Sequence, residues 1–126
     1  MKRLLYGAAI ALAAACANNT GPVAGSLTVT LTTPNSGNDG AILLSVSGPA
    51  SLTGASAASG LRLFAPATLG SVNRFVLTGT LNAGAILTLQ VPDVNQVGSY
   101  TATVQQVAAP NYQLRSLTGY SLKVSQ

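Results

Sequence analysis

The feature that most constrains the fold is a two-residue alternation of apolar and polar side chains, which recurs in short segments along the chain. In residues 26–33, SLTVTLTT, Leu27, Val29 and Leu31 alternate with serine and threonines. Alternation with period two places the apolar side chains on one face of a β-strand, whereas a helix requires a period near 3.6. Five later segments repeat the pattern, with inward-facing sets Ile42, Leu44 and Val46; Phe75, Leu77 and Leu81; Leu87, Leu89 and Val91; Tyr100, Ala102 and Val104; and Tyr120, Leu122 and Val124.

Turn-forming residues separate these segments. We expect Asp39-Gly40 to form a tight turn, residues 82–84 (Asn-Ala-Gly) to form another, and Gly79 to mark a bulge. The small-residue stretch 48–60 is long for a plain loop, so we expect a short, weak edge strand near residues 51–55. Seven or eight short strands separated by such turns predict an all-β fold, a single antiparallel β-sandwich.

One short segment carries a more specific resemblance. Residues 97–104, VGSYTATV, resemble the tyrosine-corner segment of immunoglobulin-like domains, with Gly98 two residues before Tyr100 and Ala102 two residues after it. Antibody domains have a disulfide cysteine where this chain has Ala102, and they have a core tryptophan that this chain lacks. The resemblance therefore implies an Ig-like or cohesin-like sandwich, while a tyrosine that simply begins a strand is the alternative.

The first fifteen residues have the layout of a secretory signal peptide. Lys2 and Arg3 precede an apolar run, Leu4–Leu12, and three alanines at positions 13–15 follow it. The apolar stretch 4–15 is shorter than the roughly 20 residues that a membrane-spanning helix needs. We therefore expect an N-terminal signal-peptide helix over residues 1–15.

The only cysteine, Cys16, directly follows these alanines. Ala14, Ala15 and Cys16 resemble the lipobox of bacterial lipoprotein precursors, although Ala13 stands where that family prefers leucine. The resemblance implies cleavage between Ala15 and Cys16 and acylation of Cys16. Two or three acyl chains would anchor the protein stably in a membrane. In that family, aspartate after the cysteine tends to retain the protein in the inner membrane, so the resemblance, with Ala17 and Asn18 at these positions, implies the outer membrane. An intermolecular disulfide, or ordinary signal-peptidase cleavage beside an incidental cysteine, are the alternatives.

Composition narrows the function classes. Charged residues make up 6% of the 126-residue chain, and histidine is absent. Four scattered basic residues follow the predicted signal peptide (Arg62, Arg74, Arg115 and Lys123), which disfavours nucleic-acid binding. Without histidine or a cysteine cluster, the chain offers no usual base for a nucleophile and no zinc or copper site.

The only carboxylate side chains, Asp39 and Asp93, lie in turn-like sequences, where aspartate commonly has a structural role. Asn35, Asn38 and Asp39 could supply part of a calcium shell, but a turn is the simpler interpretation. We therefore expect a protein that is not an enzyme and that needs no cofactor or metal.

Binding remains open. The segment 105–120 holds a candidate binding loop with Tyr112, Arg115 and Tyr120, residue types that are enriched at interaction hot spots. In the alternative interpretation, Tyr120 and Leu114 pack into the core and Arg115 lies at the surface.

The predicted organisation is a signal peptide (1–15), a lipidated cysteine with a flexible tether (16–25) and a β-sandwich domain (26–126). We expect an envelope lipoprotein with a membrane anchor, a non-catalytic structural or protein-interaction module whose partner is an envelope protein. The alternatives are a module that binds a glycan or another envelope polymer and a freely secreted sandwich. The sequence leaves the oligomeric state open.

Overall fold

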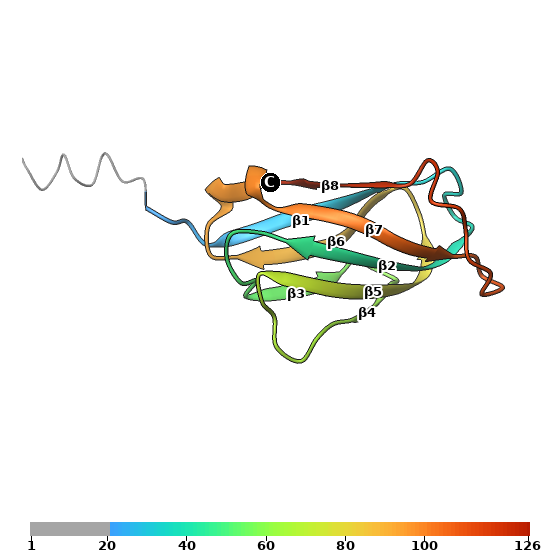
Figure 1. The fold of residues 1–126 in the computed structure, drawn as a ribbon, viewed down its shortest axis with the longest axis horizontal. Helices are drawn as coiled ribbons and strands as arrows, with labels where there is room; N and C mark the ends of the chain where they lie inside the picture. The colour runs from blue at the N-terminus through green and yellow to red at the C-terminus, as the bar shows by residue number, and fades with distance from the viewer. Residues whose placement is uncertain (1–20) are drawn as a thin grey trace, which may run out of the picture.

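A computed structural model describes residues 21–126, which form two four-stranded antiparallel sheets packed face to face (Figure 1). One sheet has the strand order β3-β6-β1-β8 and the other β4-β5-β2-β7. The strands are β1 (Gly25–Thr32), β2 (Asp39–Ser47), β3 (Gly54–Ala57), β4 (Arg62–Phe64), β5 (Val72–Leu81), β6 (Gly84–Val91), β7 (Thr101–Ala108) and β8 (Ser121–Ser125), with a 3-10 helix, η1 (Val94–Ser99), before β7. The predicted all-β sandwich is confirmed. The predicted signal-peptide helix, its cleavage site and Cys16 lie outside the described residues.

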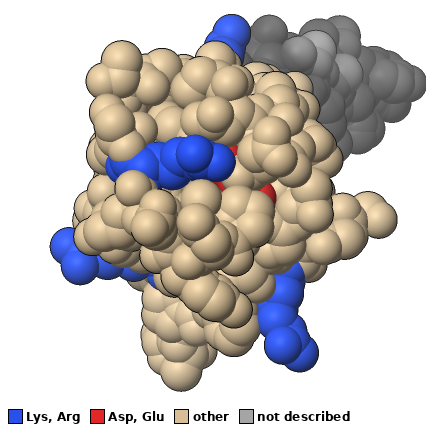
Figure 2. Space-filling view, turned by 90° about the vertical axis from the view of Figure 1, so that its right-hand side faces the viewer, with Lys and Arg blue, Asp and Glu red and all other residues tan. Residues whose placement is uncertain are grey.

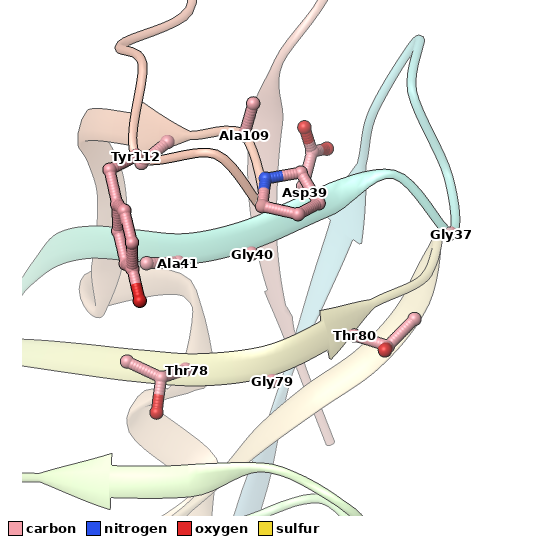
Figure 3. Close-up of a pocket in the computed structure, with 11 residues that line it drawn as sticks. Gly37, Asp39, Gly40, Ala41, Thr78, Gly79, Thr80, Ala109 and Tyr112 are labelled. Atoms are coloured by element: carbon pink, nitrogen blue, oxygen red, sulfur yellow. The ribbon is translucent and has the colours of Figure 1, made fainter.

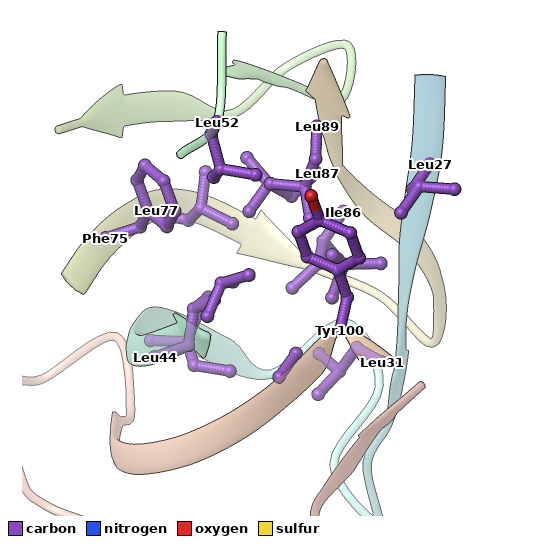
Figure 4. Packing of buried hydrophobic residues seen from close by; sticks show 14 of the residues in the cluster. Leu27, Leu31, Leu44, Leu52, Phe75, Leu77, Ile86, Leu87, Leu89 and Tyr100 are labelled. Carbon is purple, nitrogen blue, oxygen red and sulfur yellow. The ribbon is translucent and has the colours of Figure 1, made fainter. Parts of the chain in front are cut away.

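The core lies between the two sheets and is built from the alternating apolar residues (Figure 4). In β1, Leu27, Val29 and Leu31 are fully buried, while the intervening threonines are not. Phe75 and Leu77 on β5 face them from the opposite sheet, together with the predicted inward residues of β2 and β6. The alternation predicts these faces correctly because each strand buries one side only.

Three bulges adjust the alternation, and one of them adds Ile86 to β6 opposite Val29 and Thr30 of β1. Opposite the start of β2, the β5 strand contains one extra residue at Gly79, whose φ is +128°. A Cβ at Gly79 would stand 2.9 Å from the Gly60 carbonyl oxygen, so glycine is required there for both reasons. The expected bulge at Gly79 is confirmed. The third register shift, between Leu43 and Leu44, changes the phase of β7, so that Val107 is buried.

The predicted weak strand in the small-residue segment is β3, which pairs only with β6 at the edge of its sheet. It begins at Gly54, slightly later than expected. The other short edge strand, β4, has three residues, and only its central Leu63 contacts the core.

Two local expectations are wrong. Asp39-Gly40 is not a turn: Asp39 is the first residue of β2, and the turn lies at residues 34–37, where Gly37 has a φ of +85°. Leu114 is not a core residue, since 67% of it is exposed. Asp39 belongs to β2 because it pairs with Leu81 of β5, and Leu114 forms an isolated bridge with Ala108 while its side chain stays exposed.

Tyr100 immediately precedes β7 and packs its ring into the core against Gly48. In the part of the chain that the structure describes, its hydroxyl makes no hydrogen bond to protein, unlike the hydroxyl of a tyrosine corner. Burial raises the pKa of Tyr100 above its ordinary value, and the nearby Asp93 carboxylate raises it further. Tyr100 is thus a packing residue at the start of a strand.

The described chain enters the sandwich at one end. Residues 21–24 lie at this near end, where the Val23 carbonyl accepts a hydrogen bond from the Val94 amide (2.8 Å). The opposite, far end carries the β1–β2 loop (33–38), the β5–β6 turn (82–83) and the β7–β8 loop (109–120), as Figure 1 shows. β1 has eight residues, so the two ends are separated by about 26 Å.

Candidate functional site

The two carboxylates of the chain lie at opposite ends and have different partners. Asp93 is at the near end, where it caps η1: its Oδ1 accepts hydrogen bonds from the Asn95 amide (3.0 Å) and the Val23 amide (3.2 Å). Asp93 therefore joins the entering chain to η1, a structural role of the kind expected for it.

Asp39 is at the far end and is buried, with only 1% of its surface exposed. Its Oδ1 accepts hydrogen bonds from Arg115 Nε (3.0 Å) and from the Tyr120 hydroxyl (2.8 Å), and its Oδ2 accepts one from Thr33 Oγ1 (2.7 Å). Three donors thus compensate the charge of a carboxylate that has lost its hydration.

The partners of Asp39 are themselves connected. Arg115 Nη2 donates to the Asn38 carbonyl oxygen (2.7 Å), and Asn35 Nδ2 donates to the Tyr120 hydroxyl (2.9 Å). These contacts join the β1–β2 loop to the β7–β8 loop, which is more than 70 residues away in the sequence. We call Asp39 and its donors Arg115, Tyr120 and Thr33 the Asp39 cluster.

The Asp39 cluster changes the interpretation of the predicted binding loop. Of its three candidate residues, Arg115 and Tyr120 turn inward onto Asp39, whereas Tyr112 points away and is 91% exposed. Arg115 is not merely a surface residue, since it forms the only ion pair within residues 21–126. The three side chains therefore do not form one binding surface.

The atoms considered for a calcium shell are also engaged by protein donors. The Asp39 carboxylate is held by the cluster, and the Asn35 side chain and Asn38 carbonyl contact Tyr120 and Arg115. Within the described residues, no group of three or more histidine, cysteine, aspartate or glutamate side chains could hold a metal ion.

Tyr112 has an unusual backbone conformation. Its φ is +70°, and among residues 21–126 it is the one non-glycine residue with a positive φ. The Tyr112 amide donates to the Ala109 carbonyl (2.9 Å), and the Ala109 amide donates to the Gln113 carbonyl (2.8 Å). This small closed turn fixes the direction in which the ring leaves the loop.

Tyr112 borders a pocket of about 470 Å³ at the far end (Figure 3). Its ring lies across β2 beside Ala41, with the hydroxyl directed toward Thr78 on β5. The other lining residues are mostly small and come from the β1–β2 loop, β2, β5, the end of β7 and the start of the β7–β8 loop: Gly37, Asp39, Gly40, Gly79, Thr80, Ala108, Ala109 and Pro110. Three of these lining residues are glycines, which have no side chain.

The pocket offers hydroxyl groups and an aromatic ring but no unpaired charge. Asp39 is its one ionisable carboxylate, and the cluster already neutralises it. Figure 2 views this end of the molecule: the surface is mostly uncharged, the basic side chains are separated from one another, and acidic atoms are visible only beneath one of them.

Thr78, Gly79 and Thr80 were not candidates from the sequence. They lie in a strand whose pattern indicates only core packing, and their approach to Tyr112 depends on the pairing of β5 with β2. For this part of β5, the sequence contained one signal, Gly79 as the site of an expected bulge.

Comparison of the chain with protein-family models, with curated proteins and with solved structures finds no match. In residues 21–126 there is no helix of the length and apolar character required to cross a membrane.

Proposed function

We propose that this protein is a bacterial envelope lipoprotein, acylated at Cys16 and anchored in the outer membrane, whose β-sandwich is a non-catalytic interaction module. One observation carries the proposal: small residues and a single cysteine follow a short apolar segment, immediately before a folded domain. β1 begins at Gly25, so only a short tether separates Cys16 from the first strand.

The geometry of the domain fits such an anchor. The chain enters at the near end, where the Val23 backbone is bonded to Asp93 and Val94. With the lipid on that side, the far end with Tyr112 and its pocket is directed away from the membrane. A surface displayed in this way is accessible to envelope proteins or polymers.

A second candidate function, glycan binding, is favoured by a specific observation. Tyr112 is almost fully exposed at the border of a pocket that contains hydroxyl groups. Saccharide ligands have both apolar C–H faces and hydroxyl edges, and tyrosine can contact both.

The anchor is tested by intact-mass measurement and membrane fractionation of the protein from the cells that express it, beside a Cys16→Ser variant. We expect the native protein to begin at Cys16, to carry acyl chains and to sediment with the outer membrane. The variant should lose acylation and membrane association. Asn18→Ala serves as the matched control in the same segment and should behave as the native protein does.

A native protein that is soluble and carries no acyl chain would contradict the lipoprotein proposal. The protein would then be a freely secreted sandwich, the remaining alternative. A mass that shows a disulfide-linked dimer through Cys16 would also contradict it.

A further inference from the structure

We infer that the far-end pocket binds an uncharged pyranose unit of a saccharide, which stacks on Tyr112 and forms hydrogen bonds with Thr78 and Thr80. This inference rests on the glycan-binding candidate function and adds the site, the ligand class and the contact residues. It does not depend on the lipid anchor.

The first argument is the shape and lining of the pocket. A volume of about 470 Å³ lies within the range of small-molecule sites, which combine apolar walls with a few polar groups. Here Ala41 and the β7–β8 loop supply the apolar wall, and Thr78 and Thr80 of β5 are the hydroxyl-bearing residues of the strand that borders it. A sugar ring presents the matching chemistry, because its C–H face and its hydroxyl edge lie at right angles to each other.

The second argument is the conformation of Tyr112. A positive φ is unfavourable for a residue with a Cβ, and an exposed aromatic side chain gains nothing from burial in the free protein. Glycine would fit this turn without strain. The strained backbone directs the ring across the pocket toward Thr78 (Figure 3), as expected where position matters more than stability.

The third argument is electrostatic. Asp39 lines the pocket, but Arg115, Tyr120 and Thr33 occupy its oxygens, and Arg115 does not line the pocket. An anionic sugar would find no free cation there, and a cationic one would find no free carboxylate. The site therefore fits an uncharged ligand. Its contact residues are Tyr112 and the two threonines of β5, whereas the sequence had grouped Tyr112 with Arg115.

The test is a binding titration followed by NMR, using the protein purified from its expressing cells. The probes are hexasaccharides of glucose, mannose and N-acetylglucosamine in α- and β-linked forms, with a uronic acid oligomer as the charged comparison. At least one neutral probe should bind with a Kd of about 1 mM or tighter and shift the signals of Tyr112, Thr78 and Thr80. The charged oligomer should bind more weakly.

Four variants separate the site from general effects. Tyr112→Ala should weaken binding at least about 10-fold, whereas Tyr112→Phe should keep the affinity within about threefold because the ring remains. Thr78→Val should weaken it about fivefold, since it removes one hydroxyl from an isosteric side chain. Phe64→Ala is the control, because Phe64 is a partly exposed aromatic residue on β4 that does not line the pocket.

A further variant, Tyr112→Gly, tests the strain argument directly. It should raise the denaturant midpoint of unfolding while it abolishes binding, because it removes both the strain and the ring. A change that lowers stability and binding together would show that Tyr112 supports the loop instead.

Each outcome decides a separate point. If no neutral probe binds, or if binding is unaffected by Tyr112→Ala, the inferred site is wrong. Binding of the uronic acid oligomer alone, unaffected by Tyr112→Ala, would retain glycan binding as a function but place it elsewhere. Membrane fractionation reports on the anchor independently of all these results.

Discussion

Replacing Arg115 with methionine tests whether the Asp39 cluster fastens the β7–β8 loop to the sandwich. The substitution keeps the length and apolar stem of the side chain but removes the guanidinium, which contacts both the Asp39 carboxylate and the Asn38 carbonyl. The Asp39 side chain is completely buried and would keep only the hydroxyl donors of Tyr120 and Thr33. Its charge would then be only partly compensated.

The expected loss follows from this geometry. Removing one partner of a fully buried ion pair costs about 3–5 kcal/mol because the other charge stays buried without compensation. The Arg115 side chain is 28% exposed and two hydroxyl donors remain, so we expect a smaller loss, about 2–3 kcal/mol in the free energy of unfolding. Urea unfolding at neutral pH, followed by circular dichroism, measures this value. The m-value should be unchanged if the variant keeps the native fold.

Two companions complete the experiment. Arg74→Met, on an exposed arginine of β5 outside the ion pair, should change stability by less than about 0.5 kcal/mol. The double variant Arg115→Met with Asp39→Asn should cost less than the sum of its single changes, since asparagine carries no charge that needs compensation. A loss below about 0.5 kcal/mol for Arg115→Met, or strictly additive effects, would refute the role assigned to the ion pair.

Three further predictions concern the near end and the core. Gly48→Ala should cost about 2 kcal/mol, because its methyl group would overlap the Tyr100 ring, whereas Gly98→Ala, with open space around the added methyl, should change little in the same urea assay. Because the pKa of Tyr100 is raised in the folded protein, the unfolded state loses the tyrosine proton first, and the native form is destabilised as the pH rises above about 10. Tyr100→Phe should therefore lose less stability at alkaline pH than the native protein does. An equal alkaline decline in both proteins would contradict this. Asp93→Ala should cost about 1 kcal/mol and speed hydrogen exchange of the Val23 amide, and unchanged exchange would show that this contact is not formed in solution.

The sequence predicts the strand faces because burial on one side imposes a pattern that each strand carries alone. The burial of Leu27, Val29 and Leu31 can be predicted from their own alternation, with no knowledge of any other segment. Strand order has no such local signal. β1 pairs with β6 and β8, and no property of residues 25–32 distinguishes these partners from β2.

The candidate site illustrates the same limit. Arg115 and Asp39 are 76 residues apart, and their pairing depends on how the β7–β8 loop returns across the start of β2. When this pairing is not known, Asp39-Gly40 is a dipeptide typical of a turn, and Arg115 is a residue type typical of a binding loop. Tyr112 was found as a candidate from residue type alone, but its strained backbone and its approach to Thr78 are properties of the folded chain.

The strand order also determines how this chain must fold. Only one pair of consecutive strands, β4 and β5, is hydrogen-bonded among residues 21–126; every other ladder joins strands that are distant in the sequence. One sheet is complete only when β7 is available, and the other only when β8 supplies the second neighbour of β1. Long-range pairing of this kind gives folding times of milliseconds to seconds, slower than those of helical proteins of similar size. Both sheets are therefore completed late in the chain, and truncation before Ser121 should lower the urea midpoint of unfolding, because it removes the partly buried Leu122 and Val124 from the edge of the core.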